Sequence, residues 1–324
     1  MSKSSIILHR LIILSISIGL YSSLLFGQQI TQTGLYMFEP YLYNPAYGGM
    51  TNSLTLTAVA RKQWSGFPGA PTSQFIAAHL PIYRLSSGAG IRIDNQSLGA
   101  HHQINGQVSY NYIFTGLANG IISAGLGIGI LNSFLDGNIL RAPDGNYENT
   151  INHNDPNLSA QKESYTAASL TGGILYRNNS MEVGFSILQG INTTLSDRYT
   201  YTPVRHLMFN AAYFIKFSNE LRLAPSVLLK YDFRILQTDT DLQLYFKNFI
   251  FGGGIRGYSG HSFDSFKLSL SGRVMENLMA GYVYEGSLSQ LKSYNDNTHE
   301  IFLQYRLPIK LLNQRENVIY HPRM

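Results

Sequence analysis

The sequence predicts an all-β protein, a transmembrane antiparallel β-barrel of about 14 strands. Three observations predict this class: segments in which apolar and polar residues alternate, connections that alternate between long and short, and a composition that is sparse in charge. Of the 324 residues, 44% are hydrophobic, 12% aromatic and 13% charged, whereas soluble domains are about a quarter charged. The 30 glycines, 22 tyrosines and 17 phenylalanines suit tight turns and aromatic girdles.

The first 27 residues, Met1–Gly27, are predicted to be a secretory signal peptide. Lys3 and Arg10 provide a positive start, and Leu11–Phe26 forms a short apolar core. The alternative is an uncleaved anchor helix, but this core is shorter than the roughly 20 apolar residues of a membrane-spanning helix. The sequence therefore predicts export, with Gln28 as the first mature residue.

The clearest alternating segment is Gln103–Phe114, QINGQVSYNYIF. Its even positions are small, apolar or aromatic, and its odd positions are polar up to Asn111. Because successive side chains of a strand point to opposite faces, such a segment has one apolar and one polar face. About ten residues are what a tilted strand needs to cross a bilayer. A single segment would also fit a soluble sandwich, so the recurrence of the pattern decides the class.

The pattern recurs along the mature chain, and no later apolar run reaches the length of a membrane-spanning helix. An even number of strands suits an outer-membrane barrel. The predicted strands are 54–61, 73–82, 86–95, 103–114, 120–132, 164–177, 180–188, 204–217, 221–231, 239–247, 249–258, 264–273, 276–285 and 297–308.

Several strands carry charged residues on one face only, which predicts a lumen that holds the charges. An inward position avoids about 2–4 kcal/mol for each Lys or Arg that would otherwise face the lipid. Closure of the sheet also satisfies every backbone hydrogen-bonding group. The residues expected to face inward in three of these strands are Asp241, Gln243 and Lys247; Lys267, Ser269, Ser271 and Arg273; and Glu300, Gln304 and Arg306.

The connections between these strands alternate between long and short almost without exception. Outer-membrane barrels have tight periplasmic turns and longer extracellular loops, so both ends of the barrel sequence are expected on the periplasmic side. The predicted organisation is a leader at 1–27, a periplasmic N-terminal segment and possible plug at 28–53, an outer-membrane barrel at 54–308 and a periplasmic tail at 309–324. The N-terminal segment is expected to enter the barrel mouth from the periplasmic side.

Few features suggest catalysis, and the sequence is not expected to encode an enzyme. The chain has no cysteine and no short hydrolase or metalloprotease motif. The glycine-rich runs Gly125–Gly129 and Gly252–Gly254 lie inside alternating strands, where glycine relieves crowding or bends the wall. A lipid hydrolase on the barrel wall would have to bring together residues that are scattered in sequence, such as His206, Asn210, Ser269 and His299.

Metal, cofactor and nucleic-acid binding are likewise not expected. His101 and His102 lack a third ligand at metal spacing. A calcium site at Asp136–Asn138 and Asp144–Asn146 has suitable oxygen ligands, but the spacing matches neither an EF-hand nor an RTX nonapeptide, and a solvated acidic loop is the simpler interpretation. No basic run with interleaved aromatic residues supports nucleic-acid binding. The expected partners are outer-membrane lipid and other proteins.

Two segments before and after the first strand are rich in proline, glycine and aromatic residues. These are Tyr36–Gly49 and Arg61–Thr72, and such composition requires specific turns. Asn44 before Pro45 is expected to cap a turn. Trp64, the one tryptophan of the chain, has two interpretations: a girdle aromatic beside an inward-facing Arg61, or part of a packed plug or docking element.

These residues resemble the N-terminal region of the PorP/SprF family of Bacteroidetes outer-membrane proteins. The resemblance begins with Asn44-Pro-Ala-Tyr-Gly-Gly and Arg61-x-Gln-Trp-x-Gly-x-x-Gly-Ala-Pro-Thr, and it extends over essentially the whole mature chain. Further matching positions are His79-Leu-Pro-Ile, Asp94, Leu98-Gly99, Tyr110, Tyr112, Asn154-Asp155-Pro156, Pro225-Ser226, Lys230, Tyr282, Tyr284 and His299-Glu300-Ile-x-Leu.

The resemblance implies a non-enzymatic barrel of the cell outer membrane, associated with type IX secretion and gliding motility. Its implied partners are secreted cargo proteins and type IX secretion components. The residues that the resemblance marks as structural or docking elements are Asn44, Pro45, Arg61, Trp64, Gly69, Ala70 and Pro71.

The main alternative is a passive porin or small-solute transporter. Besides this alternative and the lipid hydrolase considered above, a scaffold that binds periplasmic complexes through the tail Lys310–Met324 is a further possibility.

Overall fold

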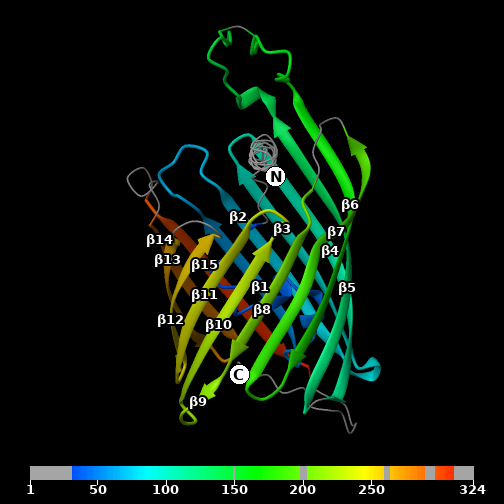
Figure 1. Cartoon of the computed structure of the whole chain (residues 1–324), viewed down its shortest axis with the longest axis vertical. Helices are drawn as coiled ribbons and strands as arrows, with labels where there is room; N and C mark the ends of the chain where they lie inside the picture. Colours follow the sequence, from blue (N-terminus) through cyan, green and yellow to red (C-terminus); the bar gives the residue numbers. More distant parts are fainter. Residues whose placement is uncertain are drawn as a thin grey trace, which may run out of the picture.

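The computed structural model describes residues 31–117, 119–148, 150–197, 203–258, 263–288 and 296–309, and these residues form a closed barrel (Figure 1). The predicted leader, residues 1–27, and the predicted tail beyond residue 309 lie outside the described residues. No helix in the described part of the chain has the length and apolarity that a bilayer crossing needs.

The wall is built from fifteen strand segments, of which the two-residue β9 continues β8 beyond Phe214. Both β8 and β9 pair with β10, so the wall has 14 strands, which confirms the predicted fold. The bounds are β1 Ser53–Lys62, β2 Thr72–Ile82, β3 Ser87–Leu98, β4 His101–Leu117, β5 Gly120–Asp136, β6 Lys162–Arg177, β7 Met181–Asp197, β8 His206–Tyr213, β9 Ile215–Lys216, β10 Leu221–Tyr231, β11 Leu236–Phe246, β12 Phe249–Tyr258, β13 Phe263–Met275, β14 Leu278–Ser287 and β15 Thr298–Pro308.

Every strand pairs antiparallel with its neighbours in sequence, and the last strand pairs with the first. The register of this closing pair runs from Ser53 opposite Pro308 to Lys62 opposite His299. Because the sheet has no free edge, the backbone groups of the wall are satisfied within the wall, as a hydrocarbon environment requires.

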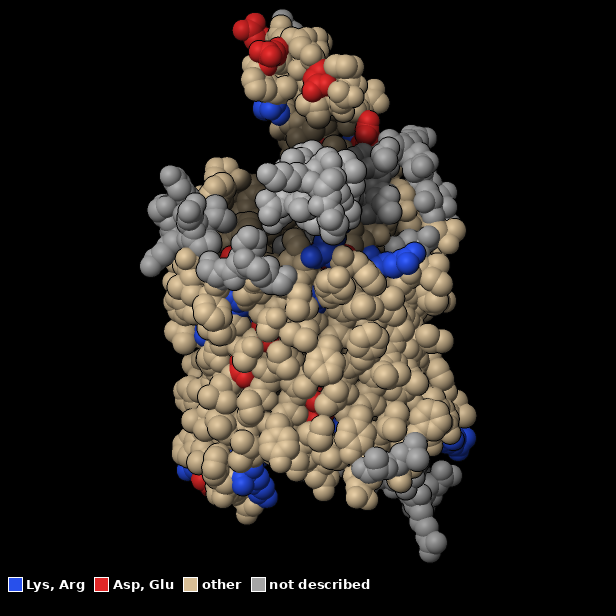
Figure 2. All heavy atoms as spheres, in the orientation of Figure 1, with Lys and Arg blue, Asp and Glu red and all other residues tan. Residues whose placement is uncertain are grey.

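The two faces of the wall differ as the alternation predicts. On β4 the polar residues are buried in the lumen, with Asn105 and Asn111 only 4% and 0% exposed, while Val108 and Tyr110 on the outer face are about half exposed. Asp241, Lys267 and Glu300 are all buried. Figure 2 shows the result on one side of the molecule: charged side chains are few across the middle band and gather toward the two ends.

Strands β4 to β7 are longer than predicted, with 16 or 17 residues each. A tilted strand needs only about 9–11 residues to cross the hydrocarbon. The additional residues extend the strands beyond the membrane, and Figure 1 shows β5 and β6 continuing toward the projecting loop. Within β7, Gln189 adopts a positive φ of 52° and the register with β6 shifts nearby. The Gln189-Gly190 pair resembles the start of a loop in sequence, but it forms a β-bulge that lets the strand continue.

The two ends of the barrel differ in the length of their connections. One end, here called the short-turn end, carries tight turns such as Lys247–Asn248 and Glu276–Asn277. The opposite end, the long-loop end, carries the β1–β2 loop, residues 63–71, and the β5–β6 loop, residues 137–161, which is the projecting loop of Figure 1. The loop predicted at 96–102 is reduced to the two residues between β3 and β4.

Residues 31–52, here called the luminal segment, lie inside the barrel, where Figure 1 shows them as a blue chain behind the front wall. The segment contains two 3-10 turns, η1 (Pro40–Leu42) and η2 (Pro45–Tyr47). Its apolar side chains supply ten members of the buried cluster, and wall residues supply the others. The ten are Leu35, Tyr36, Met37, Phe38, Tyr41, Leu42, Tyr43, Ala46, Tyr47 and Met50.

The luminal segment runs from one mouth of the barrel to the other. At the long-loop end, Thr31 and Gln32 bond to Gln96 and Gln237, which lie near the ends of β3 and β11 at this mouth. At the short-turn end, the segment passes directly into β1 at Ser53. The sequence led us to expect entry from the short-turn mouth, whereas the first described residue lies at the opposite mouth.

Candidate functional site

The seven residues marked in the sequence occupy two separate places. Asn44, Pro45 and Arg61 lie in the lumen, where all three are buried. Trp64, Gly69, Ala70 and Pro71 lie in the β1–β2 loop at the long-loop end. The residues that the sequence marks as one group therefore contribute to a luminal contact and to a surface on the rim.

Asn44 joins the luminal segment to the wall. Its side-chain oxygen accepts from the Ala46 N–H at 2.9 Å and so caps η2, while Pro45 begins the turn without needing a backbone donor. Its amide group donates to the backbone carbonyls of Ile174 and Phe185, at 3.0 and 3.3 Å. One side chain thus fixes both the local turn and its position against β6 and β7.

Arg61 belongs to a buried ionic network near the long-loop end. Its guanidinium lies 2.7 Å from the Glu285 carboxylate and 3.2 Å from that of Glu300. Glu300 in turn accepts from the Thr33 hydroxyl and from the backbone N–H groups of Gly34 and Leu35, the last two at 2.8 and 3.1 Å. The carboxylate therefore binds both the wall arginine and the luminal segment. Arg256, Lys267, Asp239 and Asp241 continue the network through further ion pairs.

A second polar contact holds the middle of the luminal segment. Glu39 accepts from the Thr57 hydroxyl at 2.6 Å and from the Gln304 amide at 3.0 Å, and it lies 3.3 Å from His79 Nε2. His79 Nδ1 accepts from the Gly49 N–H at 3.1 Å, which places the ring proton on Nε2, facing Glu39. The carboxylate of Glu39 is thereby satisfied although it is buried.

A third contact lies toward the short-turn end. The Tyr47 hydroxyl donates to Glu182 at 2.7 Å, and Arg177 pairs with the same carboxylate at 2.7 Å. Arg177 also donates to the carbonyl of Met50 at 3.2 Å. Burial of polar groups is costly unless they are paired, so these three contacts fix the luminal segment along its length. The sequence identified Arg61 and predicted that Glu300 faces inward, but it did not pair the two residues.

Close approach of the luminal segment requires glycine in the wall. A side-chain carbon at Gly125 would lie 2.6 Å from the Ala46 nitrogen and 2.7 Å from the Pro45 carbonyl carbon, both backbone atoms that cannot move aside. The glycine at position 125 therefore leaves room for the backbone of the luminal segment at Pro45 and Ala46.

We expect Gly125→Val to displace η2 and to destabilise the protein by about 3 kcal/mol, because overpacking forces the backbone to shift. The measurement is protease cleavage within residues 31–52, together with unfolding by heat in detergent. Gly106→Val is the matched control, since a side-chain carbon at Gly106 meets nothing within 4 Å. Equal behaviour of the two variants would contradict the close packing.

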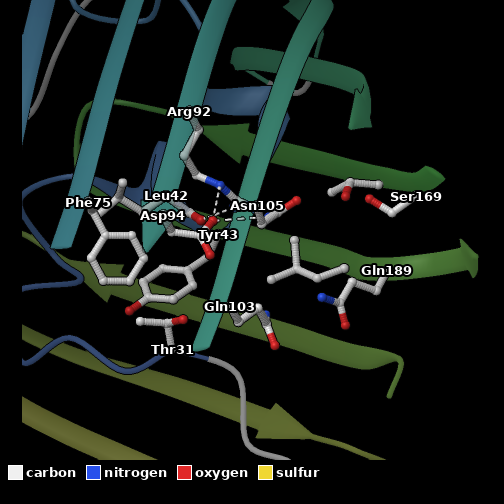
Figure 3. Close-up of a pocket in the computed structure, with 12 residues that line it drawn as sticks. Thr31, Leu42, Tyr43, Phe75, Arg92, Asp94, Gln103, Asn105, Ser169 and Gln189 are labelled. Atoms are coloured by element: carbon white, nitrogen blue, oxygen red, sulfur yellow. Dashed lines mark hydrogen bonds and ion pairs between the residues drawn. The ribbon is translucent and has the colours of Figure 1, made fainter. Parts of the chain in front are cut away.

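A small polar pocket lies beside the luminal segment (Figure 3). Arg92 and Asp94 pair across it at 3.4 Å, and Asn105 donates to Asp94 at 3.0 Å. The Tyr43 hydroxyl and the Asn105 side-chain oxygen also reach this region without a hydrogen-bond partner among the described residues. The pocket measures about 10 Å³, roughly the room of one water molecule. It is a site for solvent and too small for a solute.

A larger apolar hollow, here called the rim hollow, lies at the long-loop end. It measures about 420 Å³ and is lined by Trp64, Phe67, Pro68, Gly69, Ala70, Pro71, Leu98 and Gly99. Trp64 adopts a positive φ of 51°, a conformation that is uncommon for a bulky side chain and is maintained only by its surroundings. Its N–H donates to the Thr298 hydroxyl at 3.1 Å, and the next residue, Ser65, bonds with its backbone to Asn297. The loop is thus anchored to β15, with its apolar side chains around the hollow.

The residues considered for metal binding or hydrolysis have structural contacts instead. His101 bonds to Ser133 at 2.8 Å, His102 stacks on Phe134, and Asp136 caps a turn through Asn138. His206 and His299 bond to the Val204 carbonyl and the Tyr282 hydroxyl, respectively. Asn210 donates to Tyr47. Within the described ranges no group of three or more His, Cys, Asp or Glu side chains is placed to hold a metal ion.

Comparison with known proteins gives one match to a family. The family model described as type IX secretion system membrane protein PorP/SprF matches residues 25–305. None of the curated proteins matches the chain.

Solved barrels resemble the structure at low sequence identity. The CymD monoaromatic hydrocarbon channel has a TM-score of 0.52 and 9% identity, over 82% of this chain and 92% of that one. The outer-membrane protein Omp33 of Acinetobacter baumannii has a TM-score of 0.45 and 6% identity, over 79% and 98% of the two chains. At such identities the resemblance concerns the fold of outer-membrane barrels alone.

Proposed function

Because the chain belongs to the PorP/SprF family of type IX secretion system membrane proteins, we propose that it is a non-enzymatic outer-membrane barrel that assists the secretion or surface attachment of a particular cargo protein. The observation that carries this proposal is the filled lumen. Residues 31–51 are buried throughout, and Glu39, Glu182 and Glu300 bond them to the wall. A barrel filled in this way is suited to presenting surfaces at its two ends.

The rim hollow is the surface that we propose for cargo docking. It combines two aromatic residues, two prolines and a leucine around about 420 Å³ at the long-loop end, which in outer-membrane barrels faces the cell exterior. Concave apolar sites with an aromatic wall are where a few side chains supply most of the binding energy. The proposed ligand is an apolar side chain or short apolar segment of the secreted protein.

The test begins with deletion of the gene and comparison of the proteins released by shaving whole cells with protease. We expect one or a few secreted proteins to be lost from the surface while uptake of small solutes is unchanged. A general change in permeability with an unaltered surface would favour the alternative, a passive porin or small-solute transporter.

Complementation with Trp64→Ala is then expected to restore the barrel but to leave the surface amount of the lost protein about tenfold below wild type, since truncation of a central Trp costs about 2 kcal/mol or more of binding. Phe233→Ala is the matched control, because Phe233 is an exposed aromatic in the β10–β11 loop at the same end. Restoration of surface display by Trp64→Ala to the level of Phe233→Ala would exclude the rim hollow as the docking site.

A further inference from the structure

A second hollow, here called the vestibule, opens at the short-turn end, opposite the rim hollow. It measures about 140 Å³ and is lined by residues at the short-turn ends of strands β10 to β15. Four cationic side chains line it, and each comes from a different strand or turn: Arg222, Lys247, Arg273 and Arg306. The sequence predicts Lys247, Arg273 and Arg306 to face inward, but it does not show that they meet, because the four residues are spread over the last third of the chain.

The vestibule is strongly positive. Glu276 is the one carboxylate among its described lining residues, and Glu220 beside it pairs with Lys247 at 3.8 Å, so four cations face two carboxylates. Figure 2 shows Lys and Arg side chains at the lower rim, where the short turns lie. Such a concentration of one sign of charge in a concave site focuses the field on an anion.

Two of the arginines are held in place by neighbours. The Arg222 guanidinium lies over the Tyr245 ring, 5.2 Å from its centroid, and Arg306 Nε donates to Gln304 at 2.7 Å. Planar guanidinium groups bind carboxylates with two parallel hydrogen bonds, and a fixed orientation reduces the entropy lost on binding. The walls also include the apolar side chains of Ile250, Leu278 and Met279.

We propose that the vestibule binds an acidic segment of a partner protein, with carboxylates on the arginines and an apolar side chain against Ile250 and Met279. The mixture of cationic and apolar walls favours a peptide over an inorganic anion, which would use only the charges. Because short turns of outer-membrane barrels face the periplasm, the partner is a periplasmic protein or domain. The proposal does not depend on the rim hollow, which lies at the other end.

The test uses the full-length protein in detergent and a short fluorescein-labelled peptide of alternating glutamate and leucine, with binding followed by fluorescence anisotropy. We expect saturable binding that weakens as salt is raised from about 50 to 200 mM, because exposed charges are screened. The corresponding glutamine–leucine peptide is expected not to bind. Absence of saturable binding by the glutamate peptide, or equal binding by the two peptides, would overturn the proposal.

Arg273→Gln is expected to weaken binding about tenfold or more, and Arg222→Gln with Arg273→Gln about a hundredfold or more, since each substitution removes a charge-assisted hydrogen bond to the peptide. Arg84→Gln is the matched control: it removes an exposed cation from the β2–β3 turn at the same end, outside the vestibule. Equal effects of Arg84→Gln and Arg273→Gln would show that the peptide is attracted by general surface charge and not bound in the vestibule, and would overturn the proposal. Displacement of the peptide by inorganic phosphate at equal concentration would show an anion site without peptide selectivity, and would also overturn the proposal.

Discussion

Deletion of residues 32–50 is expected to convert a barrel with little or no conductance into an open pore. These residues fill the lumen and contribute ten side chains to the apolar cluster inside the wall. Barrels of eight strands are filled by their own side chains, whereas those of 16 or more leave an aqueous channel. A 14-stranded wall without its luminal segment is closer to the second case. Single-channel recording in planar bilayers and swelling of liposomes in small sugars are the measurements.

The control for this deletion is removal of residues 143–152, which lie in the β5–β6 loop outside the barrel. That variant is expected to conduct no more than the full-length protein. The gel shift between heated and unheated samples, which folded barrels give, verifies that both variants are folded. If the full-length protein conducts as strongly as the variant without residues 32–50, the luminal segment does not block the barrel, and the proposed role as a secretion partner loses its main support.

Glu300→Ala is expected to destabilise the protein by about 3–5 kcal/mol, the typical cost of removing one partner from a buried ion pair. Glu300 is 0% exposed and binds Arg61 together with three groups of residues 33–35. Its loss leaves these donors buried without their acceptor. Unfolding in urea gives the change in free energy, and protease cleavage near residue 35 reports release of the luminal segment.

Glu220→Ala is the comparison for Glu300→Ala. Glu220 also pairs with a cation, Lys247 at 3.8 Å, but the two side chains are 63% and 58% exposed. Exposed pairs contribute less than about 1 kcal/mol, so this variant is expected to unfold close to wild type. Glu300→Gln is expected to lie between the two, because it retains an acceptor oxygen but loses the charge. Similar unfolding of Glu220→Ala and Glu300→Ala would contradict the assigned contacts.

The wall could be predicted from the sequence because its physical cause is local. Alternation along a strand records which side chain meets lipid and which meets the lumen, and β4 follows it residue by residue. Local turn chemistry likewise identified Asn44 as a cap. The same local rule misjudged Gln189, where a polar residue and a glycine bend the strand but do not end it.

The contacts of the luminal segment could not be predicted, because they join residues that are distant in sequence. Arg61 and Glu300 are directly opposite in the closing register of β1 and β15, so their pairing follows only once closure between the first and last strands is assumed. No periodicity links Glu39 to His79 or Tyr47 to Glu182. The motif residues from Asn44 to Pro71 were therefore recognised as a group, although the structure divides them between the lumen and the rim.

The path of residues 31–52 imposes an order on biogenesis. These residues precede β1 and lie inside a ring that the pairing of β1 with β15 closes, and they extend from the long-loop mouth to the short-turn mouth. If the barrel closed first, the bulky aromatic side chains of residues 31–52 would have to enter a completed barrel. The hairpins from β2 onward must therefore wrap around a core that is already in place, and the β1–β15 seam is the last to join. Residues 31–52 thus serve as the core around which the barrel assembles.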